Sequence, residues 1–164
     1  MKIKKIKIAV VGCGRISDIH FSVIKKLERE FDLKAVCDNN HNVLIDHEKK
    51  YNVKGYSNLE EMLNNEELDL VVLCTPSGLH SKQTCLIASK AINIITEKPM
   101  ATNLNDASNM IKACEENGVK LFVIKQNRNN PTIKVLKRAI DEKRFGNIKL
   151  IQFNIFWTRP QSYY

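Results

Sequence analysis

The stretch IKIAVVGCGRIS, residues 6–17, decides which fold the chain is expected to adopt. Ile6–Val11 is a short apolar run rich in β-branched residues, which is typical of a buried strand. Apolar residues then recur at helical spacing from Ile16 to Leu27, so a helix follows the strand almost directly. Two glycines, Gly12 and Gly14, occupy the short junction between these elements.

The junction Gly12-Cys13-Gly14-Arg15-Ile16-Ser17 has the spacing of a dinucleotide-binding turn. Gly12 permits the tight turn, and Gly14 lets a pyrophosphate approach the backbone. Ser17 keeps the third position small where helix meets strand, and the helix N-terminus faces the phosphates. The residues expected at the cofactor in this segment are Gly12, Gly14, Arg15 and Ile16.

Asp38 indicates which dinucleotide is bound. It ends the second expected strand, where a carboxylate can accept both ribose hydroxyls of NAD. Asn39 and Asn40 follow it, so no arginine is at hand for a 2′-phosphate. We therefore expect NAD rather than NADP, although Asp38-Asn39-Asn40 also fits an ordinary turn.

Apolar runs and helix start signals alternate along most of the chain. Strands are expected at residues 6–11, 33–37, 53–57, 68–74, 92–95, 121–124 and 148–157. Helices are expected at residues 16–27 and 42–50, after the capping box Ser57-Asn58-Leu59-Glu60, and at residues 80–90, 103–117 and 130–143. Strands that alternate with helices predict an α/β fold: a doubly wound, Rossmann-type parallel sheet with helices on both faces.

The last expected strand, Ile148–Trp157, differs from the others. It follows Gly146, it is longer, and its residues alternate in a way that suits an open sheet in another domain. We therefore expect one domain over residues 1–146 and the first strand of a second domain over residues 147–164. The ending FWTRPQSYY, rich in aromatic residues, is typical of a binding surface.

Two further loops leave expected strands at the edge where open α/β sheets bind ligands. Thr75-Pro76-Ser77-Gly78-Leu79-His80 follows the fourth strand, and Glu97-Lys98-Pro99 follows the fifth. Partial desolvation of a lysine at this edge favours use as a base. Each loop alone is unremarkable as a turn.

Together, G-x-G-R, T-P-S-x-x-H and E-K-P on successive strands resemble the Gfo/Idh/MocA family of oxidoreductases. The segments VIKQNRNNP, LKRAI, RFGNI and FWTRPQSYY resemble one branch, the UDP-N-acetyl-glucosaminuronate 3-dehydrogenases of bacterial surface-polysaccharide (lipopolysaccharide) pathways. The resemblance covers the whole chain. It implies an N-terminal fragment, inactive by itself. The NAD-binding Rossmann domain would cover residues 1–146, and residues 147–164 would begin a truncated C-terminal α/β domain for substrate binding and oligomerisation. The missing part of that domain carries D-x-x-x-H-type residues. Ala91 stands where relatives often have glycine.

The resemblance implies NAD-dependent oxidation of a C3 hydroxyl of a nucleotide sugar, with Lys98 as the catalytic base. It adds Thr75, Pro76, His80, Glu97, Lys98 and Gln126 to the cofactor-binding residues. It implies substrate contacts from Lys98, Lys125, Asn127, Arg128, Arg159 and Tyr163. His20 fits an active-site residue and a helix-surface or core histidine equally well. A homo-oligomer is implied for the full-length form.

Composition limits the alternatives. The net charge of +8 is dispersed, which favours a solvated surface over a nucleic-acid partner, and no zinc spacing or RNA-binding segment occurs. Five cysteines without a C-x-x-C pair suit a reduced, cytoplasmic protein. No apolar run reaches the ~18 residues of a membrane span, and no metal is expected. A non-catalytic NAD-binding fragment and a related sugar or polyol dehydrogenase remain alternatives.

Overall fold

The computed structural model describes residues 4–161 of the 164-residue chain. The chain divides into two compact units, Met1–Ile124 and Lys125–Tyr164. The predicted domain boundary after residue 146 stays a prediction.

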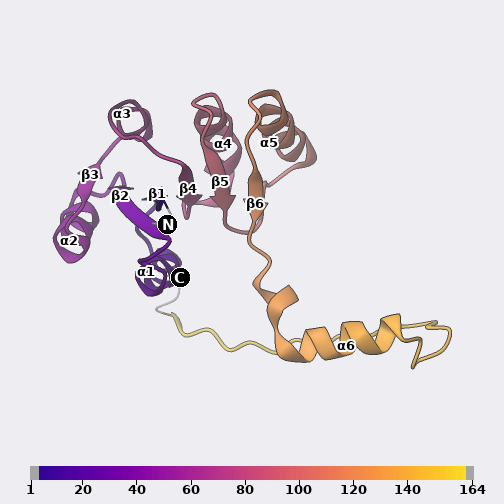
Figure 1. Cartoon of the computed structure of the whole chain (residues 1–164). Helices are drawn as coiled ribbons and strands as arrows, with labels where there is room; N and C mark the ends of the chain where they lie inside the picture. Colours follow the sequence, from indigo (N-terminus) through magenta and orange to yellow (C-terminus); the bar gives the residue numbers. More distant parts are fainter. Residues whose placement is uncertain (1–3, 162–164) are drawn as a thin grey trace. The chain divides into compact units, whose positions relative to one another are not determined.

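The first unit alternates strands and helices (Figure 1). Its elements are β1 (Ile6–Val11), α1 (Ser17–Lys26), β2 (Phe31–Cys37), α2 (His41–Tyr51), β3 (Lys54–Tyr56), α3 (Leu59–Asn65), β4 (Leu70–Leu73), η1 (Ser77–Leu79), α4 (His80–Ala88), β5 (Asn93–Thr96), α5 (Leu104–Glu116) and β6 (Leu121–Val123).

Within residues 4–161, the six strands form one parallel sheet in the order β3-β2-β1-β4-β5-β6. The predicted doubly wound parallel sheet is therefore confirmed. The order reverses between β1 and β4, and the crevice at such a reversal is where open α/β sheets bind ligands. Val11 of β1 pairs with Cys37 of β2 and with Leu73 of β4, so the three strand ends lie next to one another.

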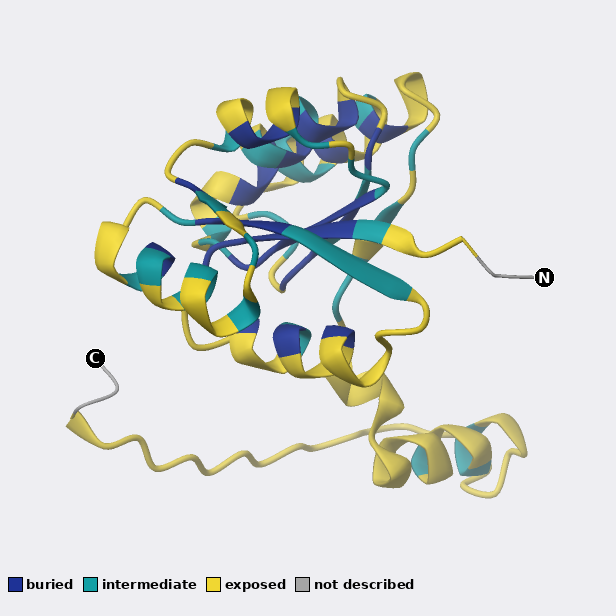
Figure 2. Cartoon of the chain, turned by 60° about the vertical axis from the view of Figure 1, so that its left-hand side comes forward, coloured by how far each residue is buried: buried dark blue, intermediate teal, exposed yellow. Residues whose placement is uncertain are grey.

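Helices cover both faces of the sheet, and the core lies between the layers (Figure 2). Alternate side chains of β1 point to opposite faces, as the pleat of a strand requires. Ile8 and Val10 pack in one cluster with Phe21 of α1. Ala9 and Val11 pack in the other, with α3, α4 and α5. Fully burying one large apolar side chain stabilises the fold by about 1.5–3 kcal/mol.

Helix caps follow the sequence with one correction. Asn103 accepts the N–H of Asp106 at 2.8 Å, as its place before α5 predicts, and Gly118 ends that region at φ +65°. The predicted capping box beginning at Ser57 is wrong: Asn58 is the N-cap of α3 and accepts the N–H of Glu61. Ser57 and Asn58 are both residue types that cap helices, and it is Asn58 that has the extended backbone of an N-cap residue.

The second unit contains η2 (Gln126–Asn129) and α6 (Pro131–Asp141). Asn130 caps α6 by accepting the N–H of Thr132, and Pro131 occupies the first turn, as predicted. The strand predicted at Ile148–Trp157 is wrong, because none of these residues lies in a helix or strand. A strand needs a neighbour for its backbone N–H and C=O groups. Among the described residues, no strand pairs with this segment.

Across residues 4–161, no helix has both the length and the apolar character needed to cross a bilayer.

Candidate cofactor and catalytic site

Gly12 joins the loops that leave β1 and β4. Its φ is +87°, and a Cβ built there would lie 2.8 Å from the backbone of both Cys74 and Thr75. Only glycine tolerates this conformation and this close approach. Its N–H also donates to the carbonyl of Cys37 at 2.8 Å. Gly12 therefore lets the loop after β1 pack directly against the backbone that follows β4, at the reversal of strand order.

Gly14 differs from Gly12, because a Cβ built on it would meet no atom within 4 Å. Its surroundings leave room for a ligand against the backbone. Ser17 is fully buried, and its Oγ donates to the Gly14 carbonyl at 2.6 Å, which holds the loop against the start of α1. The N-cap position, Ile16, makes no side-chain cap to the helix. A helix N-terminus favours an anion, and the exposed Arg15 lies beside this one, although the Ser17 and Ile19 N–H groups already donate to the carbonyls of Gly14 and Ile16.

Asp38 follows β2 and faces the same loop. Its Oδ2 accepts the N–H of Cys13 at 2.7 Å, and its Oδ1 accepts the N–H of Asn40 at 2.8 Å. Each carboxylate oxygen has a second lone pair, so the group can still accept ribose hydroxyls. The half-buried carboxylate is thus oriented before any cofactor arrives. Gly14, α1 and Asp38 together fit the diphosphate and ribose of a dinucleotide.

The loop after β4 is braced by a buried histidine. His80 is 1% exposed; its Nε2 lies 2.9 Å from the Thr75 carbonyl and its Nδ1 lies 3.0 Å from the Pro99 carbonyl. Carbonyls only accept, so a ring nitrogen that carries a proton donates to the carbonyl that it faces. The Thr75 hydroxyl donates to Gln83 at 2.5 Å, and Pro76 is exposed. Contact of these residues with the cofactor stays a prediction.

Glu97-Lys98-Pro99 follows β5, with Glu97 buried and the other two exposed. The Glu97 N–H donates to the carbonyl of Leu73, which ties this loop to the end of β4. Lys98 is therefore presented at the carboxyl edge of the sheet, as the sequence predicts, and its role as base stays a prediction.

Sequence reasoning missed the contacts that hold this loop. His20 of α1 places its Nε2 2.8 Å from Oε1 of Glu97, and the Lys98 N–H donates to Oε2 at 3.2 Å. The sequence offered no signal for the first contact, which joins residues far apart in the chain. Hydrogen bonds to backbone N–H groups, such as that between Asp38 and Cys13, leave no signature in residue identity.

Three buried thiols lie at this edge of the sheet: Cys37 ends β2, Cys74 directly follows β4, and Cys13 belongs to the glycine-rich loop after β1. Burial is the main cause that raises the pKa of Cys13, Cys37 and Cys74 to about 12. The negative charge of Asp38 adds to the effect for Cys13 and Cys37, and that of Glu97 for Cys74. These thiols stay neutral at physiological pH and offer no nucleophile. Among the described residues, no three His, Cys, Asp or Glu side chains are arranged to hold a metal ion.

The remaining predicted site residues belong to the second unit or lie outside the described residues. Gln126, Asn127 and Arg128 form part of η2 and are exposed, as is Lys125 before them. The guanidinium carbon of Arg159 lies 5.2 Å from the centre of the Trp157 ring. Tyr163 lies outside the described residues.

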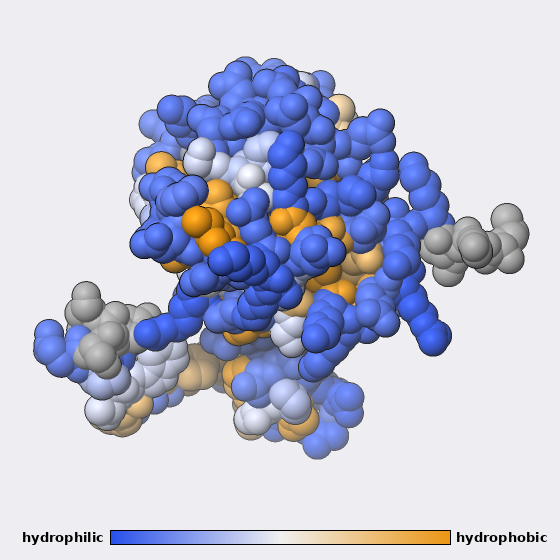
Figure 3. Space-filling view, turned by 90° about the vertical axis from the view of Figure 1, so that its left-hand side faces the viewer, coloured by the Kyte–Doolittle hydropathy of each residue, from blue (hydrophilic) through white to orange (hydrophobic). Residues whose placement is uncertain are grey.

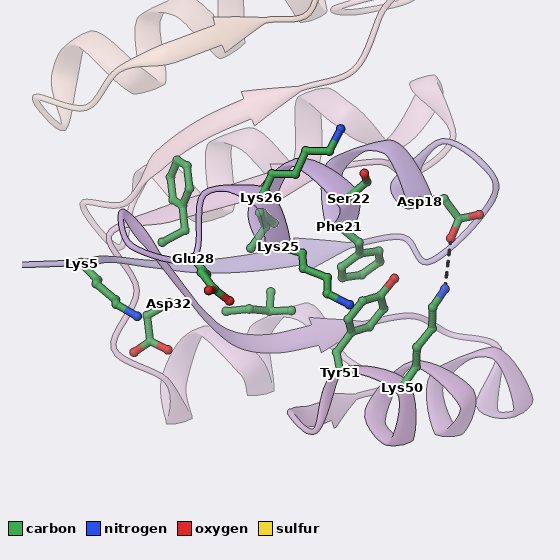
Figure 4. A pocket seen from close by; sticks show the side chains of 13 residues that line it. Lys5, Asp18, Phe21, Ser22, Lys25, Lys26, Glu28, Asp32, Lys50 and Tyr51 are labelled. Atoms are coloured by element: carbon green, nitrogen blue, oxygen red, sulfur yellow. Dashed lines mark ion pairs between the residues drawn. The ribbon is translucent and has the colours of Figure 1, made fainter.

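A groove of about 870 Å³ is lined by none of the predicted site residues. It is lined by α1, the end of α2 and the start of β2, where the stacked rings of Phe21 and Tyr51 meet lysine side chains (Figure 4). Figure 3 shows hydrophobic residues among hydrophilic ones on the face of the molecule that it presents. Lys50 pairs with Asp18 at 3.6 Å there, so part of its charge is already compensated.

Comparison with known proteins extends this picture. The model of the Gfo/Idh/MocA oxidoreductase family with its NAD-binding Rossmann fold matches residues 6–125. D-apiose dehydrogenase of Paraburkholderia graminis is 30% identical over 145 residues, which is 88% of this chain and 38% of that protein. Myo-inositol 2-dehydrogenase of Thermotoga maritima is 29% identical over 141 residues, 85% of this chain and 42% of that protein. The chain thus spans less than half the length of these relatives.

Two solved structures resemble both units of the chain. WlbA dehydrogenase from Bordetella pertussis, in complex with NADH and UDP-GlcNAcA, has a TM-score of 0.95 and 44% identity. The similarity covers 98% of this chain and 49% of that one. WlbA from Chromobacterium violaceum, with the same two ligands, has a TM-score of 0.95 and 43% identity, and covers 100% of this chain and 48% of its own. The chain belongs to the Gfo/Idh/MocA family of NAD-dependent oxidoreductases, and its residues 6–125 form the family's NAD-binding Rossmann domain.

Proposed function

We propose that this chain is the cofactor-binding part of an NAD-dependent dehydrogenase that oxidises the C3 hydroxyl of a UDP-N-acetyl-glucosaminuronate-type sugar to the 3-keto sugar. The observation that carries the proposal is the likeness to both WlbA dehydrogenases, which extends over 98–100% of the chain and so includes the second unit. The curated sugar and polyol dehydrogenases match at lower identity.

The residues of the first unit have separate roles in this proposal. The backbone at Gly14 and the start of α1 hold the diphosphate of NAD, and Asp38 accepts the adenosine ribose hydroxyls. NAD, when bound, accepts the hydride that leaves C3 of the sugar. Lys98, as the unprotonated amine, takes the hydroxyl proton, for which its nitrogen needs only hydrogen-bond reach of that oxygen.

The second unit supplies substrate contacts in the proposal. Arg159 offers a guanidinium for a carboxylate or diphosphate, with Lys125, Asn127 and Arg128 as further polar groups. A nucleotide sugar carries several negative charges, which suits the net charge of +8. A cytoplasmic location and a homo-oligomeric assembly are part of the proposal.

A related polyol dehydrogenase is the second candidate, because the D-apiose and myo-inositol dehydrogenases match 88% and 85% of this chain. These relatives support NAD-dependent oxidation of a hydroxyl group as well as the WlbA dehydrogenases do. The two candidates differ only in the substrate.

The experiment uses the 164-residue chain and a fusion of this chain to the second half of Bordetella pertussis WlbA. NADH binding to the chain is measured by fluorescence titration. Turnover of UDP-GlcNAcA, UDP-GlcNAc, myo-inositol and D-apiose by the fusion is followed by NADH absorbance. The proposal expects NADH binding by the chain and turnover of UDP-GlcNAcA alone.

Lys98→Met in the fusion should reduce turnover about 10²–10⁴-fold and leave NADH affinity nearly intact. Turnover of a polyol instead of the nucleotide sugar would favour the second candidate. A chain that folds and does not bind NADH would refute both.

A further inference from the structure

The Glu97 carboxylate connects two elements that the proposed chemistry uses separately. One oxygen lies 2.8 Å from Nε2 of His20, which belongs to α1. The other oxygen accepts the backbone N–H of Lys98 at 3.2 Å. The helix that faces the cofactor phosphates is therefore joined, through one carboxylate, to the residue proposed as base.

The contact between His20 and Glu97 is largely shielded from solvent. The side chains of His20 and Glu97 are only 14% and 9% exposed. An ionised carboxylate is an acceptor only, so both partners must donate: His20 through its Nε2–H, and Lys98 through its amide. Removing one donor from a buried carboxylate costs more than a typical hydrogen bond, because the group is left partly unsatisfied.

The backbone of Lys98 is held from both sides. Glu97 precedes it and is fixed by His20, while the carbonyl of Pro99 after it lies 3.0 Å from the buried ring of His80. The exposed lysine side chain is flexible, so the direction in which it leaves the loop depends on this backbone. An error of about 1 Å in such placement can cost about 10²-fold in rate.

We propose that His20 is a positioning residue: through Glu97, it fixes the backbone of Lys98 relative to the cofactor-binding end of α1. The proposal rests on the proposed function only in taking Lys98 as the base. His20 itself touches neither substrate nor cofactor in this scheme.

The competing explanation is that His20 and Glu97 form a buried pair that stabilises the domain as a whole. In that case, variants would lower the stability of every region together. Positioning instead predicts an effect that is largest at Lys98 and that a conservative replacement reverses.

The test compares His20→Leu, which removes the donor, with His20→Gln, which keeps an N–H donor on a side chain of similar reach. His41→Leu is the control, because His41 is an exposed histidine at the start of α2. Amide hydrogen exchange is measured by NMR on the 164-residue chain. The amides of Val10 and Val72 in the core report global stability.

In His20→Leu we expect the Lys98 amide to exchange at least about tenfold faster, with the core amides changed far less. His20→Gln should recover most of the protection, and His41→Leu should match the parent. Equal acceleration of core and Lys98 amides, or no change at Lys98, would overturn the proposal.

A kinetic arm uses the fusion described above. His20→Leu should lower kcat about 10- to 100-fold, with the KM for NAD within about twofold, and His20→Gln should restore much of the rate. An unchanged kcat in His20→Leu would also overturn the proposal. If the parent fusion turns over no sugar, the proposed function fails, and the exchange experiment still decides whether His20 controls the Lys98 backbone.

Discussion

The Asp38 carboxylate accepts the backbone N–H of Cys13 at 2.7 Å, so the residue expected to recognise ribose also holds the glycine-rich loop. Its other oxygen accepts the N–H of Asn40, just before α2. One side chain thus ties the end of β2 to the turn that leaves β1. The role proposed for Asp38 in cofactor selection therefore depends on the same carboxylate that holds the loop.

The first prediction is that the chain binds NADH in preference to NADPH and that Asp38→Ala reduces both the affinity and the preference. Loss of hydrogen bonds to a charged group, each contributing about 1.5–3 kcal/mol, should weaken NADH binding at least tenfold. Fluorescence titration with both cofactors measures this. The control is Asp46→Ala, an exposed carboxylate on α2. A parent chain with equal affinity for both cofactors would contradict the assignment of Asp38.

The same substitution should affect the stability of the chain very differently at the two glycines of the loop. Gly12→Ala adds a Cβ 2.8 Å from the Cys74 and Thr75 backbone at φ +87°, so the free energy of unfolding should fall by about 3 kcal/mol or more. Gly14→Ala meets no atom within 4 Å, so stability should change by less than about 0.5 kcal/mol.

Gly14→Ala should weaken NADH binding even though it leaves the stability of the chain nearly unchanged. The added methyl group occupies the space assigned to the pyrophosphate, and affinity should fall about tenfold or more, equivalent to at least about 1.4 kcal/mol. Urea denaturation and NADH titration of the same two variants make the comparison. Unchanged NADH affinity in a folded Gly14→Ala protein would place the diphosphate elsewhere.

The parallel sheet and the glycine-rich loop were predictable because each depends on local sequence. Apolar runs identify buried strands, and the demands on Gly12 leave few other residues possible. The hydrogen bond between His20 and Glu97 was not predictable, because the two residues are far apart in the chain and the sequence around neither of them indicates which residue it contacts. The strand expected at Ile148–Trp157 shows the same limit, since alternation describes a surface and not the neighbour that a strand requires.

Ala91 offers a test of backbone strain close to α4. Its φ is +57°, in the left-handed region that costs a non-glycine residue about 1–2 kcal/mol. Ala91→Gly should raise the free energy of unfolding by about 0.5–1 kcal/mol after the greater entropy of the unfolded glycine is counted. Ala107→Gly, inside α5, is the matched control and should lower it by about 1 kcal/mol. Denaturation with urea measures both, and a destabilised Ala91→Gly would show that no strain is relieved there.

The buried thiols predict how stability depends on alkaline pH. Burial raises the pKa of Cys74 to about 12 in the folded chain, against an ordinary value near 9. Between these values the unfolded chain has lost the proton and the folded chain keeps it, so stability falls as pH rises. The loss is at most about 1.4 kcal/mol per pH unit for each thiol.

Urea denaturation between pH 8 and pH 10.5 measures this slope, and Cys74→Ala supplies the comparison because the variant lacks one titrating thiol. The slope of Cys74→Ala should be shallower than that of the parent. Identical slopes would mean that the Cys74 thiol ionises equally readily in both states. At pH 8, where the folded thiols are neutral, Cys13, Cys37 and Cys74 should resist maleimide until the chain unfolds.

The last prediction concerns the apolar residues that follow α6. Leu150, Phe153, Ile155, Phe156 and Trp157 are 70–91% exposed. Clustered apolar side chains left in water promote association between molecules. We therefore expect the 164-residue chain to self-associate, and a version that lacks residues 148–164 to be monomeric. Since the predicted NAD-binding residues of the first unit lie outside the deleted segment, NADH affinity should be unchanged. Light scattering and NADH titration of both proteins test this, and a monomeric parent at high protein concentration would show that these side chains do not drive association.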